Sequence, residues 1–138
     1  MPSDVFFDTN VVVYTLSGDP LKAALSEQLL RAGGVISVQV LNEITRVARD
    51  KRKMGKSWPE VHVILAGVRA KCAVVPLTLQ VHQRGLGFAE RYQFGIFDSM
   101  ILAAAVLTGC TTLYSEDMND GQVIDGLTIR NPYAGLGP

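Results

Sequence analysis

The sequence VFFDTN, residues 5–10, indicates the fold class. Its first half, Val5-Phe6-Phe7, is a short apolar run with β character, and its second half turns polar at Asp8. Such a run, bounded by polar residues, predicts a strand. Further short runs of this kind occur at residues 35–36, 73–76, 111–114 and, less clearly, 127–130.

Helical patterns separate these runs. Asp19 is a good N-cap with Pro20 at the first helical position, and Gly33 is a good stop. Ser37 is predicted to cap a second helix, and the sequence from Ser57 to residue 60 fits a capping box for a third. Their apolar stripes fall at residues 40, 41, 44, 47 and 48, and at residues 61, 64, 65 and 68.

The second half of the chain continues the alternation. One helix is expected over residues 79–94, with Gly95 as its terminator. Asp98 is expected to open a helix whose residues 100–107 are so apolar that most sides must be buried, and Gly109 ends it. Strands that alternate with helices favour an α/β fold, with a central parallel sheet and helices on both faces.

The composition limits the classes of protein. The 138 residues are 48% hydrophobic and 19% charged, which fits one domain over residues 1–138, with residues 135–138 as a loose tail. Asp4 and Asp8 interrupt the region where a signal peptide would need apolar residues. The longest apolar run is far shorter than the ~20 residues that cross a bilayer. We therefore expect a cytoplasmic protein with no membrane partner.

Four carboxylates stand where strands end. Asp8 follows the first strand directly, and Asp117 stands just past the fourth. Glu43 lies within two turns of the helix after the second strand, and Asp98 begins the buried helix. Because sites in open parallel sheets form beyond the carboxyl ends of the strands, all four acids are expected at one edge.

A cluster of four carboxylates needs positive charge to offset the repulsion among its members. Carboxylates ~5 Å apart repel by roughly 3 kcal/mol per pair at an effective dielectric constant near 20. A divalent cation removes this penalty, and oxygen ligands without Cys or His suit Mg²⁺ or Mn²⁺. Each acid has a simpler explanation, however. Asp8 could begin a turn or cap a short helix, Asp98 could be an N-cap, Glu43 could be a solvated helix residue, and Asp117 could lie in a surface turn. The metal-site hypothesis therefore depends on the four acids together and not on any one of them.

The residues around these acids resemble a known family. Residues 7–10, 42–44, 97–105 and 114–117 (FDTN, NEI, FDSMILAAA and YSED) occur in the order seen in PIN domains. More narrowly, the chain resembles the VapC-type toxins of type II toxin–antitoxin pairs, and Asn131-Pro132-Tyr133 resembles the close of many of them. The similarity spans nearly the whole chain.

The resemblance implies a three-layer α/β/α sandwich and a role for each acid. Asp8 and Asp98 would be the core metal ligands, and Glu43 and Asp117 would complete the cluster. Asn10 and Ser115 stand where the family often has supporting polar residues. The fourth ligand is ambiguous, because Glu116 adjoins Asp117 and Asp120 could also contribute.

The implied activity is endonucleolytic cleavage of RNA that leaves 5′-phosphate and 3′-hydroxyl ends. A VapB-type antitoxin would block the site, commonly with a basic side chain, and the toxin would commonly be a homodimer. A metal held by the acids would lower the pKa of a bound water and orient it for attack. No other catalytic set competes, because His62 and His82 both fall inside helical patterns.

RNA that approaches an acidic pocket needs positive charge at the rim. Basic residues follow 3-4-3 spacing, which places them within roughly 80° on one helical face if the helix continues that far. These residues are Arg46, Arg49, Lys53 and Lys56. A solvated face of an amphipathic helix explains the same spacing, and Gly55 puts the continuity of the helix in doubt.

Two other functions remain as alternatives. A haloacid-dehalogenase-like phosphatase also places Asp after its first strand, but it needs a second Asp two residues later, where this chain has Asn10. A degenerate PIN-like domain would bind RNA or protein without cutting it. Degenerate members tend to lose acids, whereas all four candidates are present here.

Overall fold

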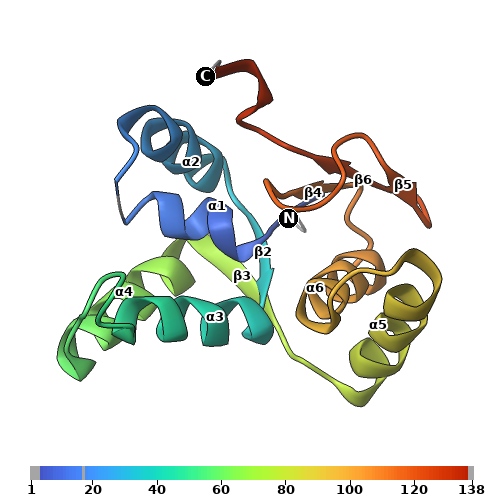
Figure 1. The fold of residues 1–138 in the computed structure, drawn as a ribbon, viewed down its shortest axis with the longest axis horizontal. Helices are drawn as coiled ribbons and strands as arrows, with labels where there is room; N and C mark the ends of the chain where they lie inside the picture. Colours follow the sequence, from blue (N-terminus) through green and yellow to red (C-terminus); the bar gives the residue numbers. More distant parts are fainter. Residues whose placement is uncertain (1–3, 17, 137–138) are drawn as a thin grey trace.

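The computed structural model describes residues 4–16 and 18–136 of the chain (Figure 1). The strands are β1 (Val5–Phe7), β2 (Gly34–Ser37), β3 (Cys72–Val75), β4 (Thr112–Tyr114), β5 (Val123–Ile124) and β6 (Leu127–Arg130). The helices are α1 (Thr9–Tyr14), α2 (Pro20–Ala32), α3 (Val38–Arg49), α4 (Trp58–Lys71), α5 (Leu79–Tyr92) and α6 (Ile96–Leu107), followed by a 3₁₀ turn at Ala134–Leu136. The alternation expected from the sequence is thus confirmed.

The strands form one sheet in the order β3-β2-β1-β4-β6-β5. The pairs β3–β2, β2–β1, β1–β4 and β4–β6 are parallel, and β5 pairs with β6 in the antiparallel direction. The predicted parallel sheet is therefore correct apart from this edge strand. β5 was not predicted, because two residues are too few to show an alternating pattern.

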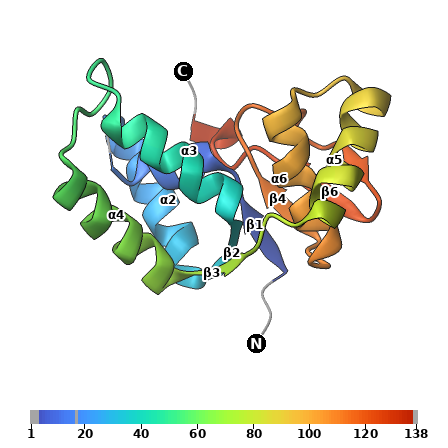
Figure 2. The ribbon, with the colours of Figure 1, turned by 90° about the horizontal axis from the view of Figure 1, so that it is seen from below.

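Helices cover both faces of the sheet. In Figure 1, α5 and α6 lie side by side on the opposite side of β1 and β4 from α1 and α2. The view in Figure 2 agrees with this separation, and it shows α3 and α4 in front of α2. The arrangement is the three-layer α/β/α sandwich that the sequence indicated.

The core lies between the sheet and these helices. Phe6, Phe7 and Leu113 are fully buried on the two central strands, β1 and β4. Residues 99–105 of α6 are all buried, as their apolar run predicted. Within the described residues, no helix combines the length and the apolar character that spanning a bilayer requires.

Several predicted helix ends are confirmed. The Asp19 carboxylate accepts hydrogen bonds from the backbone N–H groups of Leu21 and Lys22, and Pro20 begins α2. Ser57 and Glu60 form both bonds of the capping box at the start of α4. Ser37 stands at the N-cap of α3, but its buried hydroxyl makes no capping bond.

The boundary between α5 and α6 was predicted wrongly. α5 ends at Tyr92 because Gln93 takes the left-handed conformation, with φ 61°. Gly95 does not terminate this helix; it is the N-cap of α6. Asp98 consequently neither opens α6 nor caps it, but lies in its first turn. The side chain still benefits from the positive end of the helix dipole.

The C-terminal segment is more ordered than predicted. Tyr133 is buried, and its hydroxyl lies 2.5 Å from the hydroxyl of Ser26 on α2. Residues 134–136 form a 3₁₀ turn rather than the start of a loose tail. Residues 137 and 138, the rest of that predicted tail, lie outside the described residues.

Replacing Gly34 by Ala should destabilise the fold. A methyl group on Gly34 would lie 2.8 Å from Cζ of the Phe7 ring and closer still to Cε2. Because Phe7 is fully buried, its ring has no room to move. We expect Gly34→Ala to lower the free energy of unfolding by about 1–3 kcal/mol in urea titrations.

The matched control is Gly67→Ala on the exposed face of α4, where an added methyl group meets no atom within 4 Å. Alanine there should be neutral or should stabilise the helix by up to about 1 kcal/mol. Equal effects of the two substitutions would contradict the close contact between Gly34 and Phe7.

Candidate active site

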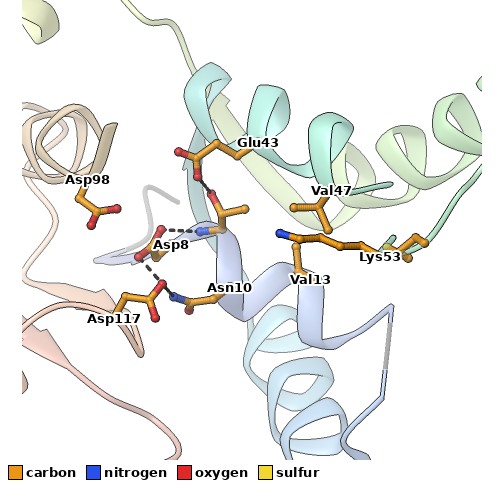
Figure 3. A pocket seen from close by; sticks show the side chains of 10 residues that line it. Asp8, Asn10, Val13, Glu43, Val47, Lys53, Asp98 and Asp117 are labelled. Carbon is orange, nitrogen blue, oxygen red and sulfur yellow. Dashed lines mark hydrogen bonds between the residues drawn. The ribbon is translucent and has the colours of Figure 1, made fainter. Parts of the chain in front are cut away.

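A pocket of about 460 Å³ lies at the carboxyl edge of the sheet. Asp8, Glu43, Asp98 and Asp117 all contribute to its wall, together with Asn10. Figure 3 shows that Asp8 comes from the end of β1, Glu43 from α3, Asp98 from α6 and Asp117 from the loop after β4. Asn10 comes from α1. The structure therefore places the four predicted acids around one cavity. The remaining lining residues are Thr9, Val13, Val47, Lys53 and Met54.

Asp8 is the deepest of the acids, with 3% of its surface exposed. Its Oδ1 accepts a hydrogen bond from the N–H of Thr9 at 2.6 Å, and its Oδ2 accepts one from the Ser115 hydroxyl at 2.7 Å. Phe7 pairs with Tyr114 in the parallel register, so the next residues of the two strands lie side by side. Asp8 also caps α1, so the simpler explanation for this acid describes one real part of its role.

Burial raises the pKa of Asp8 from its ordinary value of 3.8 to about 7, against the hydrogen bonds from Ser115 and Thr9. The charges of Asp98 and Glu43 are smaller causes of the same rise to about 7 in the pKa of Asp8. Burial also raises the pKa of Asp98, followed by the charges of Glu43 and Asp117. The pocket therefore disfavours negative charge unless a cation compensates it.

Asn10 joins two of the acids. Its Nδ2 donates to Oδ2 of Asp117 at 3.0 Å and lies 3.5 Å from Oδ2 of Asp8. Its Oδ1 accepts from the backbone N–H of Glu116 at 3.3 Å. The Ser115 hydroxyl, besides donating to Asp8, accepts from the N–H of Asp117 at 3.2 Å. Both predicted supporting residues therefore contact the acid cluster.

Glu43 is held by two residues that sequence reasoning missed. The Thr9 hydroxyl donates to Oε2 of Glu43 at 2.7 Å, and Nε2 of Gln39 donates to Oε1 at 3.1 Å. The spacing of four residues between Gln39 and Glu43 was a usable signal, since such residues share a helical face. The link from Thr9 crosses from α1 to α3, and no local pattern reveals it.

Two candidate acids lie outside the pocket. The carboxylate of Glu116 accepts a hydrogen bond from the Tyr14 hydroxyl and forms an ion pair with Lys22 at 2.5 Å. Asp120 accepts a bond from the backbone N–H of Asn131 at 2.8 Å. Of these three acids, Asp117 is the one that lines the pocket.

The four basic residues do not share a helical face. α3 ends at Arg49, so Lys53 and Lys56 lie in the turn that follows it. Lys53 lines the acid pocket, and Arg46 lines a neighbouring hollow that also includes Glu43. Lys56 approaches Glu60 to 3.9 Å, a weak exposed contact. The predicted helical face is therefore wrong, although one of the four residues, Lys53, lies in the pocket.

The four acids fit a hard divalent cation, which prefers carboxylate oxygens, and among the described residues no Cys or His lines the pocket. Nevertheless, in residues 4–16 and 18–136 no three acid, His or Cys side chains already form a metal-binding group. Thr9, Asn10, Gln39 and Ser115 occupy oxygens of three of the acids, and mutual repulsion keeps uncompensated carboxylates apart. The set is an acid-lined cavity with capacity for a cation.

The fold and the pocket define an α/β protein whose acidic site lies at the carboxyl edge of a mostly parallel sheet. A narrower assignment follows from the sequence, since the family model for the PIN domain matches residues 5–119. The chain belongs to the PIN-domain family. Among curated proteins, no sequence matches it.

Solved structures support the same fold. DNA-bound VapBC from Salmonella typhimurium has a TM-score of 0.69 at 18% identity, over 96% of this chain and 99% of that chain. A toxin–antitoxin complex from Klebsiella pneumoniae has a TM-score of 0.68 at 21% identity, over 94% and 98%. The sarcin–ricin-loop-cleaving toxin VapC20 from Mycobacterium tuberculosis has a TM-score of 0.66 at 16% identity, over 82% and 89%.

The raised pKa of Asp8 predicts a pH dependence of stability without divalent ions. In the folded state Asp8 binds a proton up to about pH 7, whereas in the unfolded chain it loses that proton near pH 4. The stabilisation that the folded state gains by binding this proton is therefore fully present below pH 4 and is lost as the pH rises through 7. Between about pH 8 and pH 5, the free energy of unfolding should rise by an amount on the order of a few kcal/mol.

Asp8→Asn should remove this dependence, as measured by urea titrations in a chelating buffer. Glu27→Gln, at an exposed position of α2, should leave the pH profile of the wild type unchanged. A profile that is equally steep in Asp8→Asn would show that another group causes it.

Proposed function

We propose that this protein is a Mg²⁺- or Mn²⁺-dependent endoribonuclease and the toxin of a type II toxin–antitoxin pair. The observation that carries the proposal is the pocket that Asp8, Glu43, Asp98 and Asp117 line together. Membership of the PIN-domain family supports it, since nucleases of that family generally use divalent metal ions. The solved structures of similar fold support it too, because one is an RNA-cleaving toxin and others are toxin–antitoxin complexes.

The residues divide into ligands and positioning groups. Asp8 and Asp98 are the core ligands of the cation, and Glu43 and Asp117 complete the set directly or through water. The bound cation supplies Lewis acidity, which lowers the pKa of a water and stabilises charge on the phosphate. Ser115 and Asn10 orient the carboxylates of Asp8 and Asp117 through the hydrogen bonds described above.

Thr9 and Gln39 do the same for Glu43, with one hydrogen bond to each of its oxygens. A carboxylate held on both sides keeps its orientation at little entropic cost when a cation binds. These bonds therefore preorganise the pocket. They also contribute to its stability in the absence of the ion, since they satisfy acceptors that burial removes from water.

The phosphatase alternative loses support from Asn10. A dehalogenase-like phosphatase needs an acid at this position that exchanges protons with the substrate. Here the side-chain amide donates to the acids, and its carbonyl oxygen accepts from the backbone of residue 116. The group is a fixed hydrogen-bond bridge, and an amide does not act as a general acid.

The biological setting is part of the proposal. The partner is a VapB-type antitoxin that covers the acid pocket and blocks RNA entry, the substrate is RNA, and the active form is a homodimer. We place the protein in the cytoplasm, as one PIN domain over residues 1–138. The complexes of similar fold support the antitoxin partner.

Loss of the core acids should abolish cleavage. We expect Asp8→Asn and Asp98→Asn to reduce Mg²⁺-dependent cleavage of single-stranded RNA at least about 100-fold, because each removes a charge from the proposed ligand set. Asp120→Asn is the matched control, since that carboxylate bonds the backbone of residue 131 outside the pocket. Gel analysis of labelled RNA, with mapping of the 5′-phosphate and 3′-hydroxyl ends, measures the effect.

Two outcomes would favour the alternatives. RNA binding without cleavage in Mg²⁺ or Mn²⁺ would support the non-catalytic PIN-like domain. Unchanged cleavage by Asp98→Asn would remove this acid from the proposed machinery.

Divalent ions should also stabilise the protein. A cation that binds only the folded state raises its stability by mass action, by about 2.7 kcal/mol at a concentration 100 times the Kd. We expect Mg²⁺ or Mn²⁺ to raise the melting temperature, more at pH 8 than at pH 6, because protons compete for Asp8. In Asp8→Asn/Asp98→Asn, differential scanning fluorimetry should show no shift. An equal shift in this variant would place the ion elsewhere.

A further inference from the structure

The turn that joins α3 to α4 is held from within. The backbone carbonyl of Asp50 accepts hydrogen bonds from the N–H groups of Lys53, Met54 and Gly55, at 3.0, 3.0 and 2.9 Å. The Asp50 carboxylate accepts another from the N–H of Arg52 at 2.9 Å. Gly55 has φ +57°, the left-handed region that favours glycine. Residues 50–56, here called the α3–α4 turn, therefore have a defined conformation.

Arg49 fastens this turn to the helix that follows it. Its Nη1 donates to the carbonyl oxygen of Lys56 at 3.0 Å, and its guanidinium lies 4.5 Å from the centre of the Trp58 ring. The planar guanidinium can stack on the ring while its in-plane N–H groups donate, whereas an ammonium group has no flat face to stack. Arg49 therefore links the end of α3 to the start of α4.

The consequence of this geometry is the position of Lys53. Figure 3 shows its side chain lying beside Val13 and Val47, with the amino group directed into the pocket towards the acids. Among the described residues that line the pocket, Lys53 is the one with a positive charge. In the part of the chain that the structure covers, it forms no ion pair within 4 Å.

We propose that the α3–α4 turn is a phosphate-binding arm. In this arm Lys53 binds a phosphate of the RNA strand, while Arg49 and Gly55 hold the turn so that Lys53 reaches the pocket. The inference rests on the proposed ribonuclease function. An RNA strand must bring negative charge to a pocket lined by four acids, so a cation on the pocket wall offsets part of the repulsion. The apolar side chains of Val13 and Val47 lie beside the stem of Lys53, which leaves its ammonium group as the part that extends into the pocket.

Lys53→Gln tests the charge, and Lys51→Gln, an exposed lysine of the same turn, is its control. The measurement is steady-state cleavage, in Mg²⁺, of a single-stranded RNA oligonucleotide that the wild type cuts, over a series of KCl concentrations. Lys53→Gln should raise KM about fivefold with a smaller change in kcat, and Lys53→Arg should restore most of the affinity. The slope of log(kcat/KM) against log[KCl] should become shallower by about 0.7, the value for one phosphate contact with a single strand. Lys51→Gln should match the wild type.

Arg49→Lys tests the positioning role, because it keeps the charge and loses the planar group. We expect a rise in KM close to that of Lys53→Gln, with the salt slope changed in the same direction. Gly55→Val should act likewise, whereas Gly55→Asn should be close to the wild type, since Asn tolerates a positive φ.

The outcomes separate the two proposals. If the wild type cleaves RNA and Lys53→Gln has the KM and the salt slope of the wild type, the arm is overturned and the ribonuclease stands. Wild-type kinetics in Arg49→Lys together with a raised KM in Arg49→Gln would make Arg49 a direct RNA contact and overturn its positioning role. A wild type that cuts no RNA in Mg²⁺ or Mn²⁺ overturns both proposals.

Discussion

The buried carboxylate of Asp8 is the constraint on which the rest of the site depends. It lies at the end of the central strand β1 with almost no exposure to solvent, and burial opposes its charge. Such a group persists only where neighbours donate hydrogen bonds to it or a cation compensates it. Ser115, directly after the adjacent strand β4, supplies one donor, and the first N–H of α1 supplies another. The order of strands in the sheet thus positions the site, because the pairing of β4 with β1 places Ser115 next to Asp8.

Much of the fold and of the acid cluster could be predicted from the sequence, because strand ends and helix caps are marked by local patterns. Apolar runs that end in Asp8 or precede Asp117 mark strand ends, and parallel strands bring their carboxyl ends to one edge. The left-handed Gln93 could not be predicted, because glycine is the usual residue there and Gly95 stands two residues later. The sequence therefore predicts Gly95 as the end of α5 and Asp98 as the start of α6. In the structure Gly95 is the N-cap of α6, and Asp98 lies in its first turn.

Long-range contacts account for the other differences. Neighbouring carboxylates can face opposite ways: Glu116 points to Lys22 and Tyr14, and Asp117 points to the pocket. Nothing in the local sequence distinguishes them, since the choice depends on a lysine 94 positions away. The basic residues failed as a helical face for a related reason. The bonds that Asp50 accepts end α3 and fold the chain back.

The pairing of β4 with β6 has a consequence for local unfolding. The backbone N–H of Ser115 donates to the carbonyl of Arg130, and Tyr133 packs edge-on against Tyr14. The loop that carries Asp117 is therefore braced by β6 and by the segment that follows it. A local opening that detaches β6 from β4 consequently releases this loop. The completeness of the acid pocket thus depends on the outer strands of the sheet as well as on its centre.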